Sequence, residues 1–425
     1  MKILVAHNAY QQPGGEDAVV AAEHRLLEAH GHVIVRYQRN NDELRNGGGL
    51  PLKAGFETVW ASRSFRDIKA LIAKEEPDLA HFHNTLPLIS PAAYYGCAEA
   101  GVPVVQTLHN YRLLCPSATL MRGGKVCEDC MGKSVAWPGV VHACYRKSRA
   151  VTAAVTSMLA VHRAMGTWRK KVDVYVALTE FARGKFVEGG LPAERIVVKP
   201  NFVVRDPGAK IGTGTSALYV GRLSEEKGPR VLLRAWARLG GGIPIKIAGD
   251  GPLREELRRQ IGATGLIGAE LLGLLSPEKI AGLLHGARFL VFPSVWYEGF
   301  PMTIAEAFAC GVPVIASRLG SMAEIVTDGK TGLHFTAGDD RDLAAKVEWA
   351  WTQAEEMEEM GRAARREFEE KYTSAANYKR LMEIYEMAMA NRRFRCWGAR
   401  VDAVQIPEMV GRIEERQLRR SVGNK

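Results

Sequence analysis

The hydrophobic residues of the first two hundred positions fall into short β-branched runs that alternate with stretches of helical periodicity. Apolar runs of this length, bounded by turn residues, predict strands. The predicted strands are 2–6, 33–37, 79–83, 102–109, 173–178 and 196–201, and the clearest helices are 18–29 and 68–74. Short apolar strands separated by helices predict a parallel sheet with helices on both faces.

The alternation starts again after 206–216, a stretch enriched in Gly, Pro and Ser that is typical of a linker. A second set of strands is predicted at 217–221, 244–249, 270–275, 289–294 and 313–317, followed by helices from Asp340 and Ala376. We therefore expect an α/β chain with two doubly wound, Rossmann-like domains. The expected divisions are a first domain at 1–203 with an insertion at 111–171, a second domain at 204–374, a closing helix at 375–392 and a tail at 393–425 without clear periodicity.

The composition limits the cellular setting and the partners. The chain has 425 residues, 47% of them hydrophobic, yet no apolar run reaches the length of about 18 residues that crosses a bilayer. The first ten residues also lack a signal peptide, so we expect a cytoplasmic protein whose seven cysteines are reduced thiols or metal ligands. The formal charge of +10 favours anionic partners such as phosphates, nucleic acid or an anionic bilayer.

Two glutamates flank the start of the helix that follows strand 289–294. Because Pro301 suits a first helical position and disfavours helical backbone at Phe300, Glu298 is expected in the loop and Glu306 in the helix. Such a loop, at the carboxyl end of a parallel strand, is where open α/β sheets bind anions, and Gly299 permits close backbone approach. Since carboxylates repel phosphate, we expect both acids to bind neutral hydroxyl groups. An ordinary solvated glutamate is the alternative.

A second loop adds two cations. The sequence YVGRLSEEKG (219–228) sets Arg222 and Lys227 after strand 217–221, again at the carboxyl end of a strand. Two cations at this position can neutralise a diphosphate, which Mg²⁺ does in other proteins. Solvated surface residues are the alternative.

Together these elements resemble family 4 of the retaining glycosyltransferases, whose GT-B fold sets two Rossmann-like domains across a cleft. The resemblance depends on GRLSEEKG (221–228), AGDGPL (248–253), the two glutamates separated by seven residues, EAFACGVPVIAS (306–317) and DGKTGLHF (328–335). It extends over most of the chain and implies that the closing helix crosses back to the first domain.

The resemblance implies a role for each matching residue. Arg222 and Lys227 would hold the donor diphosphate, Glu306 the ribose hydroxyls and Glu298 the donor sugar. The implied donor-binding residues are Gly14, Gly15, Arg222, Lys227, Gly249, Glu298, Gly299, Phe300, Pro301, Met302 and Glu306. The implied catalytic residues are His109, Glu298, Arg222 and Lys227.

Two features of the first domain belong to the same resemblance. The segment QQPGGED (11–17) matches the glycine loop of the family, in which Gly14 and Gly15 would let the backbone lie against the donor phosphates. His109, at the end of strand 102–109, matches a histidine beside the donor sugar. A plain turn and a structural histidine are the alternatives.

The implied reaction is the transfer of a hexose, with retained anomeric configuration, from a nucleoside diphosphate sugar to a carbohydrate or lipid-linked acceptor in surface polysaccharide or lipopolysaccharide synthesis. The acceptor hydroxyl would attack from the side that the nucleotide leaves, and the departing diphosphate would take its proton. No dedicated nucleophile is evident, so preorganised positive charge would supply most of the rate, without a cofactor.

Four other functions are alternatives to sugar transfer. A nucleotide-sugar epimerase or a sugar phosphorylase of the same fold is an open alternative. A nucleic-acid-binding protein is a rival from another class, but no recognition motif accompanies the positive charge, so we expect no nucleic-acid partner. A dinucleotide dehydrogenase is disfavoured, since no G-x-G-x-x-G follows strand 2–6.

The insertion at 111–171 contains two further patterns. Its cysteines could clamp a structural zinc ion, although free or redox-sensitive thiols are the alternative because there is only one C-x-x-C pair. These cysteines are Cys115, Cys127, Cys130 and Cys144.

The second pattern is basic. Residues 131–171 include eight Lys and Arg and no acid. Val151, Val155, Met158 and Leu159 form an apolar stripe at helical spacing, with Trp168 beside the last basic cluster, as in a helix on an anionic membrane surface. The alternative is a helix packed on its own domain with a solvated basic face. The membrane interpretation would make the acceptor lipid-linked and the protein peripheral at the inner face of the membrane.

Overall fold

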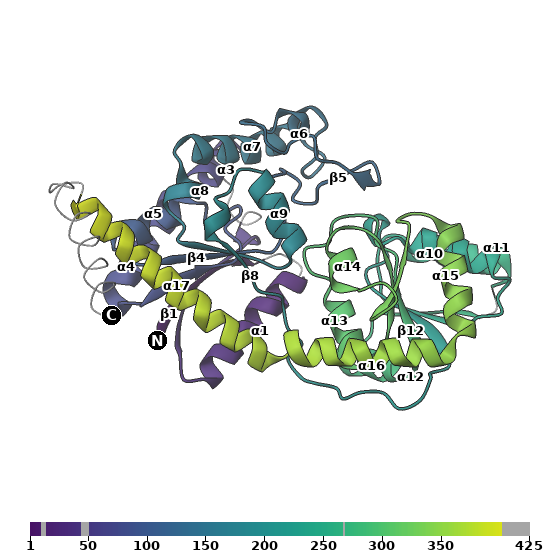
Figure 1. Cartoon of the computed structure of the whole chain (residues 1–425). Helices are drawn as coiled ribbons and strands as arrows, with labels where there is room; N and C mark the ends of the chain where they lie inside the picture. Colours follow the sequence, from purple (N-terminus) through teal and green to yellow (C-terminus); the bar gives the residue numbers. More distant parts are fainter. Residues whose placement is uncertain (10–13, 44–50, 267, 402–425) are drawn as a thin grey trace, which may run out of the picture.

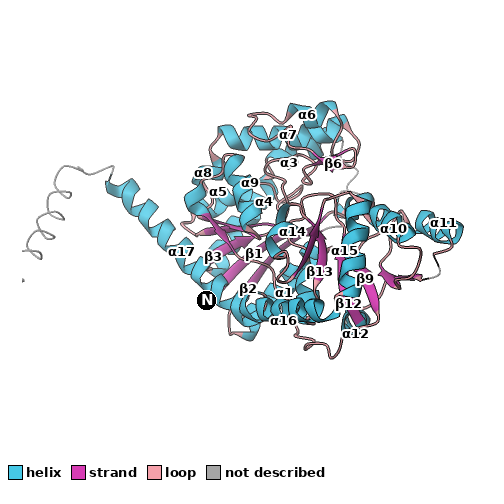
Figure 2. Cartoon of the chain, turned by 45° about the vertical axis from the view of Figure 1, so that its right-hand side comes forward, coloured by secondary structure: helices cyan, strands magenta, loops and turns pink. Residues whose placement is uncertain are grey.

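The computed structural model of the chain describes residues 1–9, 14–43, 51–266 and 268–401 and contains two α/β domains side by side (Figure 1). Each domain has a six-stranded sheet. Neighbouring strands in both sheets are parallel. Helices cover both faces of the sheets (Figure 2). The predicted pair of doubly wound parallel sheets is therefore confirmed.

The N-terminal sheet has the strand order β2-β1-β3-β4-β7-β8. Its strands are β1 (Lys2–Ala9), β2 (Val33–Asn40), β3 (Leu79–Phe82), β4 (Val104–Leu108), β7 (Val174–Ala177) and β8 (Ile196–Val198). Along β1, Ile3 and Val5 pack under helix α17 (Ser374–Val401), whereas Leu4 and Ala6 pack on the opposite face. This burial on two faces explains the uninterrupted apolar runs.

The helices of this domain are α1 (Gly15–Ala29), α3 (Pro51–Val59), α4 (Ser62–Glu75), α5 (Ala92–Glu99), α6 (Trp137–Val141), α7 (Arg149–Ala164), α8 (Thr167–Lys170) and α9 (Glu180–Glu188). A short hairpin of β5 (Met121–Arg122) and β6 (Lys125–Val126) projects from the insertion. Three of the four residues of the apolar stripe of α7 face the core, whereas Val151 is 39% exposed. Val155, Met158 and Leu159 are buried in the domain core, as is Trp168, because α7 packs against α3 and α6. Most of the stripe therefore packs on its own domain, which is the stated alternative to a stripe that faces a membrane.

The C-terminal sheet has the order β11-β10-β9-β12-β13-β14. Its strands are β9 (Ser216–Val220), β10 (Ile245–Ala248), β11 (Ala269–Gly273), β12 (Ala287–Phe292), β13 (Val314–Ser317) and β14 (Gly332–Phe335). Its helices are α10 (Pro229–Arg238), α11 (Arg254–Thr264), α12 (Pro277–Gly286), α13 (Met302–Ala309), α14 (Gly320–Ile325), α15 (Asp340–Thr352) and α16 (Ala354–Lys371). Strand β14 and helix α16 were not predicted.

The last two helices connect the domains. Helix α16 lies on the C-terminal domain, and α17 continues across to the N-terminal one (Figure 1). There Leu381, Ile384 and Tyr385 are fully buried against the N-terminal sheet. Among the described residues, no helix combines the length and the apolar character that a membrane span requires.

The strand orders define where each sheet can bind a ligand. In the C-terminal sheet, β9 and β12 are neighbours from which the chain winds in opposite directions, and β1 and β3 are the equivalent pair in the N-terminal sheet. Ligands of open α/β sheets bind beyond the carboxyl ends of such strands. The loops after β9 and β12, and those after β1 and β3, are therefore the ones to examine.

Candidate active site

The two loops of the C-terminal domain are joined by an ion pair. Lys227 ends a 3₁₀ turn (Glu225–Lys227) after β9, and Glu298 lies in the loop after β12. Lys227 Nζ lies 2.8 Å from Glu298 Oε1 and 2.9 Å from Oε2. Ser294 Oγ donates to Glu298 Oε1 at 2.6 Å. Glu298 is only 4% exposed, and a carboxylate buried to this extent needs such partners.

The backbone around Glu298 is held from both domains. Its carbonyl oxygen accepts from Ser321 Oγ at 2.8 Å and from the hydroxyl of Tyr111, in the N-terminal domain, at 3.3 Å. A Cβ at Gly299 would lie 2.5 Å from the carbonyl oxygen of His109. The close approach expected at this glycine is therefore made, in this structure, by the chain's own backbone.

Helix α13 begins one residue later than expected. Pro301 is its N-cap, with extended backbone, and Met302 is its first residue. The free amide groups of its first turn are therefore at the end of the helix that follows the Glu298 loop. Phe300 turns its ring toward the core, edge-on to Tyr372. Thus these three residues contribute backbone to the crevice, and Phe300 also contributes packing.

Glu306 lies in the second turn of α13. Burial raises the pKa of its carboxyl group above the usual value. No hydrogen bond or ion pair joins its carboxyl group to any described residue. It is therefore an acceptor that the protein itself does not satisfy, unlike Glu298.

The side chain of Arg222 also lacks a partner among the described residues. Its carbonyl oxygen accepts from the Tyr219 hydroxyl at 3.1 Å, which fixes the loop after β9, but its exposed guanidinium has no partner among the described residues. Gly249 supports this loop from behind. At its φ of 143° a Cβ would lie 1.9 Å from the Gly221 carbonyl oxygen, so only glycine lets the two loops pack this closely.

In the N-terminal domain, the predicted glycine loop is described only from Gly14 onward, because 10–13 lie outside the described residues. Gly14 is the N-cap of α1, and its amide donates to Asp17 Oδ2 at 2.8 Å. Asp17 Oδ1 lies 2.9 Å from His7 Nε2. Gly15 is the first residue of the helix, and a side chain there would meet no other atom within 4 Å.

His109 follows β4 and is half-buried. Burial lowers the pKa of its ring to about 3, so the imidazole is neutral at physiological pH. Its Nε2 lies 2.9 Å from Nδ1 of His83, which follows β3. Sequence reasoning missed His83, although two histidines with alternate spacing at the end of an apolar strand were a visible signal.

Two cavities occur near these loops. One, of about 500 Å³, lies between Gly123 and Gly124 of the β5–β6 hairpin and the second-domain residues Glu225, Gly228 and Arg230, next to Lys227. It forms part of the crevice between the domains.

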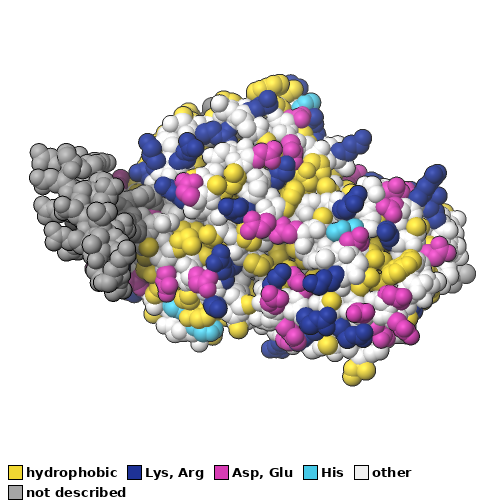
Figure 3. All heavy atoms as spheres, in the orientation of Figure 1, with side chains coloured by type: hydrophobic (Ala, Val, Ile, Leu, Met, Phe, Trp, Pro, Cys, Tyr) yellow, Lys and Arg dark blue, Asp and Glu magenta, His cyan; other side chains and the backbone are white. Residues whose placement is uncertain are grey.

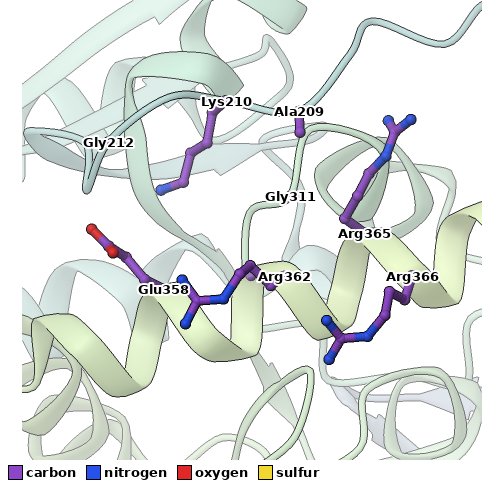
Figure 4. A pocket seen from close by; sticks show the side chains of 9 residues that line it. Ala209, Lys210, Gly212, Gly311, Glu358, Arg362, Arg365 and Arg366 are labelled. Carbon is purple, nitrogen blue, oxygen red and sulfur yellow. The ribbon is translucent and has the colours of Figure 1, made fainter.

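The second cavity, of about 410 Å³, lies at the other end of α13 and is shown in Figure 4. Arg362, Arg365 and Arg366 project from α16 in different directions, and the ammonium of Lys210 lies on the side of Glu358. Arg365 is already neutralised, since its guanidinium bonds Asp206 at 2.6 Å and also Glu369. None of the residues that line this cavity belongs to the loops after β9 and β12, so it is separate from the crevice.

Burial, and then the neighbouring Cys115 thiol, raise the pKa of Cys130, one of the four cysteines of the insertion, to about 11. The four cysteines do not form a metal site in this structure. Among the described residues, the only three possible ligands within 4.8 Å of one another are Glu23, His81 and His83. The structure therefore does not support the expected zinc ion.

Comparison with known proteins gives two family matches. Residues 204–367 match the model described as glycosyl transferases group 1, and residues 13–206 match the one described as glycosyltransferase family 4. An uncharacterised glycosyltransferase of Methanocaldococcus jannaschii is 34% identical over 36% of this chain and 43% of its own length. The D-rhamnosyltransferase WbpZ of Pseudomonas aeruginosa is 32% identical over 37% of this chain and 41% of its own length. The matched part thus spans less than half of these relatives.

Among solved structures, Anabaena HepE in complex with UDP-glucose aligns with a TM-score of 0.63 at 19% identity, over 90% of this chain and 98% of that one. At this identity the likeness shows the fold alone.

Proposed function

This chain belongs to glycosyltransferase family 4, of the group 1 type, and from that premise we propose that it transfers a hexose from a nucleoside diphosphate sugar to a hydroxyl acceptor with retention of configuration. The observation that carries the proposal is the arrangement at the β9–β12 switch point. There Lys227 and Glu298 pair with each other, whereas the side chains of Arg222 and Glu306, on the same two segments, have no partner among the described residues.

The roles follow from what each group can still bind. Lys227 has three N–H donors, and Glu298 uses both of its oxygens on one side of the ammonium, so a diphosphate oxygen can bind without breaking the pair. Arg222 can take the second diphosphate charge through its planar guanidinium. Glu306 would accept from the ribose hydroxyls, and the paired Glu298 from the sugar. The first amides of α13 would add further donors to the diphosphate.

The rate would come from stabilisation of the leaving group. As the glycosidic bond breaks, negative charge grows on the diphosphate, where Lys227 and the α13 amides are already fixed and Arg222 can add its charge. The acceptor hydroxyl would attack on the same face, and its proton would pass to a departing phosphate oxygen. No residue needs to form a covalent bond with the sugar, and His109, being neutral, would act by hydrogen bonding.

The acceptor side is proposed from the surface of the insertion. Six of the thirteen exposed large hydrophobic residues of the described chain lie there, and they are Val135, Trp137, Val141, Val151, Val161 and Met165. Basic side chains cover the same part of the N-terminal domain (Figure 3). Exposed apolar groups among cations suit an anionic bilayer, so we propose a lipid-linked acceptor of the kind used in surface polysaccharide synthesis.

The donor proposal is tested with a panel of UDP-, GDP- and ADP-hexoses, scored by thermal shift and by NMR of the product anomer. We expect stabilisation by at least one donor and a retained anomer. Arg222→Ala with Lys227→Ala should lower kcat/KM by about a thousandfold or more, because two charged contacts to the leaving group are lost. Arg238→Ala is the control, since Arg238 pairs with Asp340 on the surface of α10. An inverted product, or full activity of the double variant, would refute the proposal.

The membrane proposal is tested by flotation with vesicles. Trp137→Ser with Val141→Ser should reduce recovery on anionic vesicles, whereas Leu274→Ser, an exposed apolar residue of the other domain, should not. Equal recovery on neutral and anionic vesicles would contradict it.

A further inference from the structure

A chain of buried polar groups lies behind His109 in the N-terminal domain. Lys199, after β8, places Nζ 2.5 Å from Glu23 Oε1 on α1. The other oxygen, Glu23 Oε2, faces His83 Nε2 at 3.7 Å, and His83 Nδ1 lies 2.9 Å from His109 Nε2. The first three members are at most 4% exposed. Only His109 has a part in the transfer proposed above.

Stability alone does not account for this series of buried polar groups, because a buried ion pair adds little stability after its desolvation cost. Glu23 Oε2 is buried without a hydrogen-bond partner among the described residues. A metal ion does not suit the cluster either. Glu23, His81 and His83 offer ligand atoms within 4.8 Å of one another, but both ring nitrogens of His81 already bond hydroxyl groups, and a nearby ammonium would repel the cation.

The protonation states of the chain follow from burial and charge. Burial lowers the pKa of His109 to about 3 and that of His83 well below its usual value, so both rings are neutral. Burial opposes ionisation of Glu23, but Lys199 outweighs it and holds the pKa of Glu23 below the usual value. Glu23 is therefore a carboxylate that can only accept, and each imidazole has a single N–H.

The direction of the hydrogen bond between His83 and His109 follows from the negative charge that faces His83 at 3.7 Å. The carboxylate favours the tautomer of His83 that carries its proton on Nε2. Nδ1 of His83 is then an acceptor, so His109 must donate from Nε2 across the 2.9 Å contact. This leaves Nδ1 of His109 unprotonated, and it makes no hydrogen bond with any described residue.

We propose that Glu23 and His83 are positioning residues that hold His109 in the tautomer protonated on Nε2, so that its Nδ1 accepts a hydrogen bond from a hydroxyl group of the donor sugar. The identity of the ligand rests on the proposed function, whereas the tautomer does not. A donor that lacks this hydroxyl would leave the Nδ1 acceptor without a partner, so His109 selects hydroxyl-bearing hexoses over the matching deoxy sugar.

Glu23→Gln is the informative variant because it keeps the shape and replaces the acceptor that faces His83 by a donor. The Lys199 ammonium needs an acceptor, so the amide oxygen takes the Oε1 position and the amide NH₂ faces His83. His83 then accepts at Nε2 and donates from Nδ1, and His109 must carry its proton on Nδ1. The control is His81→Gln, which is as buried but bonds Thr107 and Tyr385 and not His109.

The tautomer is read by long-range ¹H–¹⁵N NMR of ¹⁵N-histidine-labelled protein without ligand, with His109 assigned by its loss in His109→Gln. We expect the Nε2-protonated signature in the wild type and in His81→Gln, and the Nδ1-protonated one in Glu23→Gln. In transfer assays, Glu23→Gln should raise the donor KM about tenfold with little change in kcat, the size of one lost hydrogen bond.

A merely structural role would lower the thermal midpoint and leave the tautomer unchanged. An Nδ1-protonated His109 in the wild type, or an unaltered tautomer in a folded Glu23→Gln, would overturn the inference. If Glu23→Gln does not fold, His83→Leu replaces it and should yield a mixture of tautomers at His109; a single unchanged tautomer would again refute the inference. Failure of every donor in the transfer assay would overturn the proposed function, and the NMR result on the free protein would still decide this one.

Discussion

Replacing Gly299 by alanine should displace the loop that carries Glu298 and slow transfer much more than it destabilises the protein. The added Cβ would lie 2.5 Å from the His109 carbonyl oxygen, whereas an ordinary contact is 3.4 Å or longer. Both atoms belong to backbone, so no side chain can rotate away. The loop and the end of β4 must therefore separate by about half to one ångström, the range that relieves a clash of this size.

The displacement acts directly on the proposed chemistry. Glu298 is the residue before Gly299, and its bonds of 2.8 and 2.9 Å to Lys227 fix the ammonium that would hold the diphosphate. A misplacement of about 1 Å at a reacting group can reduce the rate about a hundredfold. We expect kcat/KM to fall about 10- to 100-fold, while overpacking costs about 1–3 kcal/mol of stability, or a few degrees in the thermal midpoint.

The assay is steady-state transfer with the donor identified by the panel, together with thermal unfolding of the same samples. Gly282→Ala is the matched control, because its added Cβ would meet no atom within 4 Å. If Gly299→Ala retains its kcat/KM within about twofold, the contact between Gly299 and His109 does not position the loop that carries Glu298, and the prediction is wrong.

Three further outcomes are expected. Burial raises the pKa of Glu306 above its usual value of 4.5, so the folded protein binds this proton more tightly than the unfolded chain and loses stability as pH rises from 4.5 through the folded pKa. Glu306→Gln should therefore unfold at a higher temperature than the wild type at pH 7.5 and at the same temperature at pH 3.5. It should also bind donor about 10- to 100-fold more weakly by titration calorimetry. Lys227→Met leaves the buried Glu298 unpaired and should cost about 1–3 kcal/mol in denaturant unfolding, whereas Arg222→Met, which breaks no contact, should cost almost nothing. EDTA should leave turnover within about twofold, because the fixed cations replace a metal ion; reversible loss of activity would contradict this.

The strands were predictable because a strand that is buried on both faces has an unbroken run of apolar residues, as in β1 and β12. Strand β14 was missed because Gly332 and His334 interrupt its four residues. Helix α16 was missed although Met357, Met360 and Phe368 are buried at helical spacing, since charged residues dominate its composition. The stripe of α7 was predicted correctly as helical, but a membrane surface and the core of its own domain were both left open, because periodicity identifies an apolar face but not what covers it.

The positions of the candidate residues in the fold were predictable, whereas their contacts were not. Motif spacing placed Arg222, Lys227, Glu298 and Glu306 at the ends of two strands, and the sheet order makes those strands neighbours. The Lys227–Glu298 pair joins side chains 71 positions apart, and single-sequence spacing holds no information about such a partner. The same limit hid Glu23 and Lys199, which are 176 positions apart.

The division between satisfied and unsatisfied charges has a functional logic. Glu298 is buried and would be costly without Lys227, so this pair must be present before any ligand binds. A donor that arrives then finds Lys227 already oriented and loses little entropy in fixing it, whereas Arg222 is free to order on the diphosphate. The Arg222 side chain loses conformational entropy only when a dianionic ligand orders it, so a neutral sugar would gain no binding free energy from it. The crevice should therefore discriminate for the diphosphate first and for the sugar second, through the acceptors that remain at Glu306 and His109.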